Sequence, residues 1–149
     1  MSLSHSYTVN LEWKEDRKGL LSAEHIESNL EVATPPPFNK GIEGIWSPEH
    51  LFTSAVSSCL MTTFLAIAEN SKLEFVSFSC GATGKLEQID GKFVMSEILL
   101  QPHLVIHREE DYAKAERILH KAEKGCLITN SITSKVTMEP TIMVANLVL

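Results

Sequence analysis

A long segment that nothing interrupts, from Ser47 to about Asn70, constrains the fold of this chain most. Ser47 suits a helix N-cap, Pro48 suits the first helical position, and Glu49 complements the positive end of the helix dipole. Apolar residues then recur at three- and four-residue spacing and surround the second half of the segment almost completely. The pattern predicts a buried central helix rather than a surface helix.

Strand patterns lie on both sides of this helix. Before it, residues 7–13 alternate apolar and polar side chains as in a half-buried strand, a polar turn follows, and residues 20–32 could form the returning strands. After it, two strand-like runs, 75–86 and 92–107, are joined through Asp90-Gly91, the preferred residues of a type I′ hairpin turn. The order of strands, helix and strands predicts a mixed α+β fold.

The C-terminal third predicts a shorter helix and a last strand. Three acidic residues at 109–111 suit a helix N-terminus, and Gly125 suits the C-cap. Cys126 follows directly, on what the pattern indicates is a partly exposed loop, and strand alternation resumes at 132–138. We predict that the whole chain, 1–149, forms one α+β domain.

Composition argues against several classes of function. The formal net charge is −6, from 13 basic and 19 acidic residues, and no basic run is interleaved with aromatic residues, so nucleic acid is not an expected partner. Residues 1–13 lack a signal-peptide pattern, and no membrane span of about 18 apolar residues is predicted. We therefore expect a cytoplasmic protein without a membrane partner. Three cysteines without a Cys-x-x-Cys pair fit neither a disulfide framework nor a zinc ribbon.

The cysteines are the candidates for chemistry. Cys59 lies inside the predicted helix on its inward face, either as a small buried hydrophobe or as a reactive thiol. Cys126 is either a reactive thiol or a surface thiol without a role. Two such thiols suit peroxidatic and resolving roles if their Cα atoms come within about 7 Å. Cys80 shares the inward face of a strand with Val76 and Phe78, and we assign it no chemical role.

A reactive thiol needs a neighbouring cation that stabilises the thiolate. Arg108 and Arg117 lie on or beside an acidic helix and are expected to be solvated surface charges paired with acidic residues between Glu109 and Glu123. Arg17 stands in the turn before Gly19, where it either reaches a cleft or remains an exposed turn charge. On local grounds, Glu49 needs no explanation beyond the helix dipole.

Three motifs stand in order along the chain: Trp46-Ser47-Pro48-Glu49-His50-Leu51-Phe52, then Ala55-Val56-Ser57-Ser58-Cys59, and later Cys126-Leu127-Ile128-Thr129-Asn130. Together they resemble the OsmC/Ohr family of osmotically inducible and organic hydroperoxide resistance proteins, and the resemblance covers nearly the whole chain. It implies an OsmC-like fold with antiparallel sheets packed around a long buried central helix. It also implies an intertwined homodimer with sites at the subunit interface.

The resemblance further implies a thiol-dependent peroxidase that reduces alkyl or lipid hydroperoxides to alcohols in oxidative stress defence, without a cofactor. Carried over by position, Cys59 attacks the peroxide and Cys126 resolves the sulfenic acid. Arg17 stabilises the thiolate, and Glu49 orients Arg17. A dithiol reductant, for which a lipoyl protein is a candidate, regenerates the enzyme. Because Glu49 lies about 15 Å from Cys59 along the helix axis, we expect an Arg17–Glu49 pair to reach Cys59 through a bend or from the partner subunit.

The apolar side chains available to line a substrate cleft favour an organic peroxide over hydrogen peroxide. They are Phe38, Ile45, Trp46 and Phe52.

Two departures from the family pattern keep alternatives open. Leu127 stands where proline is usual, which leaves room for an OsmC-like redox-sensing or small-molecule-binding dimer without efficient peroxidase activity. The other departure is His50, which stands where Glu or Gln is common.

Independently of these departures, acyl transfer by Cys59 with a histidine base is an alternative: His50 is too far, about 13 Å away along the helix, and the sequence does not single out His103, His107 or His120. His103 and His107 lie about 13 Å apart along a strand, too far to share one ion, so no metal site is predicted.

Overall fold

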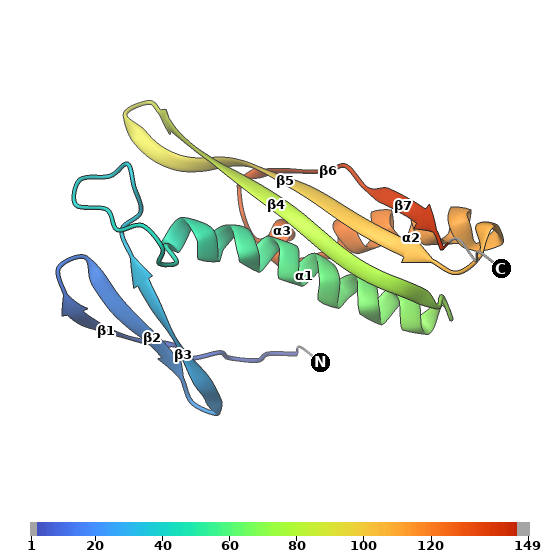
Figure 1. Ribbon diagram of the computed structural model, residues 1–149, viewed down its shortest axis with the longest axis horizontal. Helices are drawn as coiled ribbons and strands as arrows, with labels where there is room; N and C mark the ends of the chain where they lie inside the picture. The colour runs from blue at the N-terminus through green and yellow to red at the C-terminus, as the bar shows by residue number, and fades with distance from the viewer. Residues whose placement is uncertain (1–2, 146–149) are drawn as a thin grey trace. The chain divides into compact units, whose positions relative to one another are not determined.

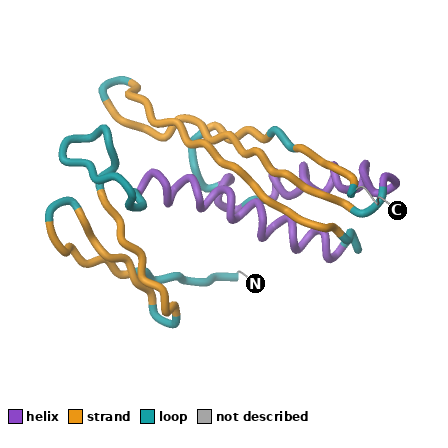
Figure 2. Tube along the Cα trace, in the orientation of Figure 1, coloured by secondary structure: helices purple, strands orange, loops and turns teal. Residues whose placement is uncertain are grey.

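The computed structural model describes residues 3–145 of the chain. Its contacts divide the chain into two compact units, Met1–Leu51 and Phe52–Leu149, which are described in turn (Figures 1 and 2). The predicted α+β class is confirmed, since both strands and helices are present in the expected order. A single domain over the whole chain stays a prediction.

The N-terminal unit contains a three-stranded antiparallel sheet. Its strands β1 (Asn10–Glu15), β2 (Lys18–Ala23) and β3 (Ile26–Ala33) follow one another in the order β1-β2-β3. The prediction of a half-buried first strand is wrong, because Leu11 is 66% exposed and Trp13 is 72% exposed. Their alternation produces one apolar face, but the described part of the chain places no layer over it.

A loop after β3 leads to the start of α1 (Pro48–Asn70). The backbone N–H of Ala33 donates to the carbonyl of Trp46 over 2.8 Å, which holds the two ends of the loop together. Ser47 is fully buried, and its hydroxyl oxygen accepts a hydrogen bond from the backbone N–H of His50 over 3.1 Å. The predicted N-cap and the predicted helix are both confirmed.

The second unit is built on a long antiparallel hairpin of β4 (Phe75–Ile89) and β5 (Lys92–Ile106), visible in Figure 1 as the two longest strands. Asp90 and Gly91 have φ angles of 52° and 81° in its turn. Positive φ at both central positions is the requirement of the predicted type I′ turn, and Asp-Gly meets it with little strain.

Two short C-terminal strands complete this sheet. They are β6 (Lys135–Met138) and β7 (Thr141–Val144), and both pair with β5 in parallel. The sheet order is β4-β5-β6, with β7 also against β5. The sheet therefore combines an antiparallel hairpin with parallel additions.

Two helices cover the sheet. A 3₁₀ turn, η1 (Glu109–Asp111), leads into α2 (Tyr112–Gly125), as the acidic run predicted. Gly125 is the last helical residue, and the C-cap is Cys126 rather than the predicted Gly125. Alternate residues of β5 are fully buried against the apolar faces of α1 and α2 in one core. The members of that core from these three elements are Val56, Leu60, Phe64, Ala68, Ile98, Leu100, Leu104, Ile106, Ala115, Ile118, Leu119 and Ala122.

The segment after Cys126 differs from the prediction. A loop was expected, but one turn of helix, α3 (Leu127–Asn130), follows at once. Cys126 has an extended backbone (φ −69°, ψ 113°), which ends α2 and serves as the N-cap of α3. The Ser131 hydroxyl donates to the carbonyl of Leu127 over 2.7 Å and closes the turn.

In length and composition α1 is apolar enough to cross a membrane, with a mean hydropathy of 1.7 over its best window. This differs from the expectation of no such span, because the serines and threonines of the segment interrupt the apolar run without lowering the average much. Its buried side chains, among them Leu60 and Phe64, pack in the core described above.

Candidate functional site

Cys59 lies in the middle of α1 and faces inward, as predicted. The residue is 8% exposed. One turn further along the helix, the hydroxyl of Thr63 lies 3.9 Å from the Cys59 sulfur. The Thr62 hydroxyl donates a hydrogen bond to the Cys59 carbonyl over 3.1 Å, so this bond involves the backbone and not the thiol.

Cys126 lies at the junction of α2 and α3. It is fully buried, which corrects the prediction of a partly exposed loop thiol. The cause is the unpredicted turn α3, in which the backbone N–H of Asn130 donates to the Cys126 carbonyl over 3.0 Å. The preceding residue, Gly125, approaches α1 closely enough that a Cβ there would meet the Thr63 methyl at 3.8 Å, an ordinary packing distance.

The fold brings the two thiols together although they stand 67 positions apart in the sequence. The Cys126 thiol acts to lower the pKa of Cys59, and both cysteines are free. The backbone N–H groups of Leu127 and Ile128, in the first turn of α3, also act to lower the pKa of Cys59. Cys59 is therefore surrounded by hydrogen-bond donors that favour its thiolate form.

The surroundings separate the acidities of the two thiols. Burial acts to raise the pKa of Cys59, but hydrogen bonds from Ile128, Cys126, Thr63 and Leu127 together lower it below the ordinary thiol value. For Cys126 burial is again the largest influence, and it raises the pKa. Donors from Thr129 oppose that rise, whereas the interaction with Cys59 adds to it. Cys59 is thus the thiol that ionises first, with Cys126 as its protonated partner.

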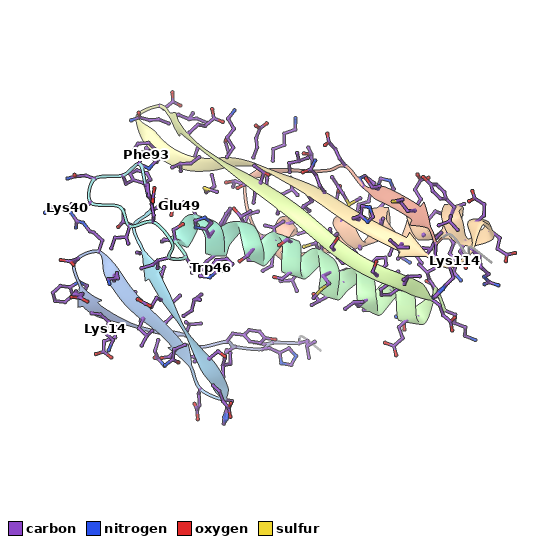
Figure 3. The ribbon with its side chains drawn as sticks, viewed as in Figure 1. Lys14, Lys40, Trp46, Glu49, Phe93 and Lys114 are labelled. Carbon is purple, nitrogen blue, oxygen red and sulfur yellow. The ribbon has the colours of Figure 1, made fainter. Side chains whose placement is uncertain are left out.

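Arg17 and Glu49 belong to the N-terminal unit. Arg17 is exposed in the turn between β1 and β2, and it lines a surface hollow of ≈ 410 Å³ together with Leu11, Trp13 and Pro48. Glu49 is half-buried in the first turn of α1, where Figure 3 labels it. The contact of an Arg17–Glu49 pair with Cys59 stays a prediction.

Cys80 is half-buried at the edge of the core, as its position predicted. Its burial raises its pKa above the ordinary thiol value, which suits an unreactive thiol. Val76 was predicted on the same face but is 51% exposed. The register shifts between Phe75 and Ser77, and this bulge turns Val76 away from the core.

Sequence reasoning missed three contributors to the site. Thr63 could have been found, because it lies four residues after Cys59 on the same helical face. The amides of Leu127 and Ile128 could not, because their role depends on the unexpected turn α3 and on its approach to α1. In the described residues, no group of three or more His, Cys, Asp or Glu side chains is arranged to hold a metal ion.

Comparisons with known proteins agree with this architecture. An OsmC-like protein of Vibrio cholerae has a TM-score of 0.82 at 24% identity, over 92% of this chain and 99% of that one. An organic hydroperoxide resistance protein of Elizabethkingia anophelis has a TM-score of 0.75 at 18% identity, over 97% of this chain and 100% of that one. Likenesses at this level of identity show the shared fold.

Sequence comparison points the same way. The chain is 23% identical to the protein YmaD of Bacillus subtilis over 138 residues, which is 91% of each chain. Residues 39–141 match the profile of the OsmC-like protein family. That match covers all of α1, the β4–β5 hairpin, α2 and both thiols of the site. The chain belongs to the OsmC-like protein family.

Proposed function

We propose that this protein is a thiol-dependent peroxidase that reduces organic hydroperoxides, with Cys59 as the attacking thiol and Cys126 as the resolving thiol. The observation that carries the proposal is a pair of buried free thiols that influence one another, with the pKa of Cys59 lowered and the pKa of Cys126 raised. A peroxidase of this kind needs one ionised thiol and one protonated thiol within bonding reach. Membership of the OsmC-like family supports a peroxide-related role.

The reaction follows from these two states. The Cys59 thiolate attacks the distal oxygen of the hydroperoxide, the O–O bond breaks, and the alkoxide takes a proton and leaves as the alcohol. Cys59 is then a sulfenic acid. The Cys126 thiol attacks its sulfur, water leaves, and a Cys59–Cys126 disulfide forms. A dithiol returns both residues to thiols and becomes a disulfide itself.

In this scheme the surroundings of Cys59 stabilise its thiolate and favour apolar peroxide substrates. The backbone N–H groups of Leu127 and Ile128 hold the thiolate in position without adding a charged side chain. Both thiols are buried, at 8% and 0% exposure, and we propose alkyl or lipid hydroperoxides as substrates for that reason. In this proposal Arg17 assists the thiolate, and Glu49 orients Arg17.

A homodimer is part of the proposal. The apolar face of β1, represented by Leu11 and Trp13, is exposed in a single chain, and so are Met61 and Leu65 on α1. A soluble protein seldom leaves such faces uncovered, and a second copy of the chain would cover them. We place this dimer in the cytoplasm, where reduced thiols persist.

The experiment is peroxide consumption by the fully reduced protein, measured with cumene hydroperoxide and with hydrogen peroxide and with dihydrolipoamide as the dithiol. We expect a clear preference for cumene hydroperoxide and complete loss of activity in Cys59→Ser. In Cys126→Ser we expect one equivalent of alcohol without turnover, and a sulfenic acid at Cys59 that dimedone traps. Cys80→Ser is the matched control and should retain wild-type activity.

The opposite result also has a definite meaning. If clean, reduced wild-type protein consumes neither peroxide, the peroxidase proposal is wrong. A Cys59–Cys126 disulfide that forms under mild peroxide, but that dithiols return to thiols only slowly, would instead indicate a redox-sensing dimer.

A further inference from the structure

We propose that one face of α2 is the docking surface for an acidic protein that carries the reducing dithiol; the proposal rests on the peroxidase function above. This α2 cationic face consists of Arg117, His120, Lys121 and Lys124. The four residues, with Glu116, line a surface hollow of ≈ 340 Å³, and all four are exposed. Such a concentration of basic side chains is unusual in a chain whose formal net charge is −6.

The geometry of the helix places these residues together. The positions 117, 120, 121 and 124 follow the spacing of neighbours on one helical face. The opposite face of α2 is buried in the core through residues such as Ile118 and Leu119, so the cationic face is the solvent side. The ion pairs found among the described residues use other cations, on the sheets and beside η1. The charges of Arg117, Lys121 and Lys124 therefore remain available to a partner.

The cationic face lies next to the thiol pair along the chain. Lys124 is two residues before Cys126, and the Asn130 side-chain amide donates to the Lys124 carbonyl over 3.2 Å. This bond ties the end of α2 to the turn α3, whose amides act to lower the pKa of Cys59. Cys126 itself is buried on the core side of α2, so a protein bound to this face approaches the disulfide around the end of the helix, at Lys124. Lys114, labelled in Figure 3, lies one turn before Arg117 near the start of the helix and does not line the hollow.

The arrangement suits an extended acidic surface better than a small anion. The four side chains extend over about 10 Å of helix, at ~1.5 Å rise per residue, and the long ones are flexible. No buried donor is among them, since all four are exposed. Exposed charges of this kind mainly raise the rate of encounter with a partner of opposite charge. A small neutral dithiol would gain nothing from them.

Reduction of the Cys59–Cys126 disulfide by the partner is a two-step thiol–disulfide exchange. The partner's dithiol attacks the Cys59–Cys126 disulfide and forms a mixed disulfide, and its second thiol then displaces the protein thiol. Two electrons and two protons pass from the dithiol to Cys59 and Cys126. The partner leaves with a disulfide of its own. Docking on α2 acts only on the approach of this partner and leaves the exchange itself unchanged.

The test compares one dithiol on two carriers. Turnover of cumene hydroperoxide is measured with dihydrolipoamide, which is neutral, and with a dihydrolipoyl domain of net negative charge. The variant is Arg117→Glu/Lys121→Glu, and the matched control is Lys92→Glu/Lys135→Glu, which makes the same change in net charge at exposed positions of the sheet. We expect kcat/KM for the acidic domain to fall at least about tenfold in the α2 variant at low salt, the lower end of typical steering effects. The wild-type and variant values should converge near ~0.5 M salt, where screening is nearly complete.

Three outcomes would overturn docking on α2. They are an equal loss with dihydrolipoamide and with the acidic domain, an equal loss in the control variant, or no salt dependence in the wild type. Failure of the peroxidase function is a separate result, because it would abolish turnover with dihydrolipoamide in the wild type. In that case salt-dependent binding of the acidic domain, measured by titration of the wild type and of the α2 variant, still tests the docking surface.

Discussion

The hydroxyl of Ser47 and the imidazole Nδ1 of His50 lie 2.7 Å apart at the start of α1. The Ser47 backbone N–H also donates to Nδ1, over 3.2 Å, while the His50 N–H donates to the Ser47 hydroxyl oxygen. The two residues therefore form a reciprocal capping box in which His50 takes the place of the usual Glu or Gln. His50 thus provides the same helix cap that Glu or Gln provides at this position in the family pattern.

The capping box predicts the effect of changes at His50. His50→Ala removes the acceptor for the buried Ser47 N–H and should lower the free energy of unfolding by about 1 kcal/mol. His50→Gln restores an acceptor at the same position, and its stability should stay close to wild type. Urea unfolding measures both, with exposed His107→Ala as the control. Equal losses in the Ala and Gln variants would contradict the capping role.

The thiol pair predicts a pH effect of changing Cys126. The Cys126 thiol acts to lower the pKa of Cys59 as a hydrogen-bond donor, so Cys126→Ala should raise that pKa. Thiolate reacts and thiol does not, so the rate of Cys59 alkylation by iodoacetamide rises with pH through this pKa. We expect the inflection to lie at higher pH in the variant than in wild type. Cys80→Ala should leave it in place, and an unchanged inflection in Cys126→Ala would show that the donor is unimportant.

Leu127 makes a related prediction that is specific to this chain. Its backbone N–H is one of the donors that lower the pKa of Cys59, and a proline at this position has no N–H. Leu127→Pro should be tolerated, because proline suits the first position of a helix and the extended Cys126 suits the position before it. We expect the alkylation inflection to move to higher pH in Leu127→Pro but not in Leu127→Ala. A shift of the same size in both variants would assign the effect to the side chain.

Gly84 predicts a packing effect on β4. A Cβ at this position would lie within contact distance of the Thr53 hydroxyl on α1 and 2.7 Å from the Met95 methyl. Gly84→Ala forces these side chains to move and should lower the free energy of unfolding by roughly 1–3 kcal/mol. Gly81 is on the same strand with nothing within 4 Å, so Gly81→Ala should not destabilise the protein. Similar urea midpoints for the two variants would count against close packing at Gly84.

The proposed homodimer predicts different effects on the two faces of β1. Leu11→Lys places a charge on the exposed apolar face and should shift the protein toward monomer in analytical ultracentrifugation. Glu12→Lys makes the same kind of change on the opposite face and should leave the oligomer intact. Wild-type protein that sediments as a monomer at every concentration would rule out the dimer.

Local sequence patterns were sufficient for most of the secondary structure. The Ser47-Pro48-Glu49 start and the Asp90-Gly91 turn each act through a few neighbouring residues, so both were predictable from the order of residues alone. The inward face of Cys59 was likewise predictable, because helical periodicity assigns a residue to a face. Burial of the first strand was not predictable, because the alternation of apolar and polar residues shows that one face is apolar but not what covers that face.

The class of the fold, the central helix and the identity of the two candidate thiols all followed from the amino-acid sequence. Tertiary packing was needed to bury Cys126, to bring its thiol to Cys59 from 67 positions away in the sequence, and to place the amides of α3 where they act to lower the pKa of Cys59. The reason is physical: helix caps and turns are local interactions, whereas the acidity of a thiol depends on burial and on donors that distant segments bring to it. The difference in acidity between Cys59 and Cys126 therefore depends on the packing of the end of α2 against α1.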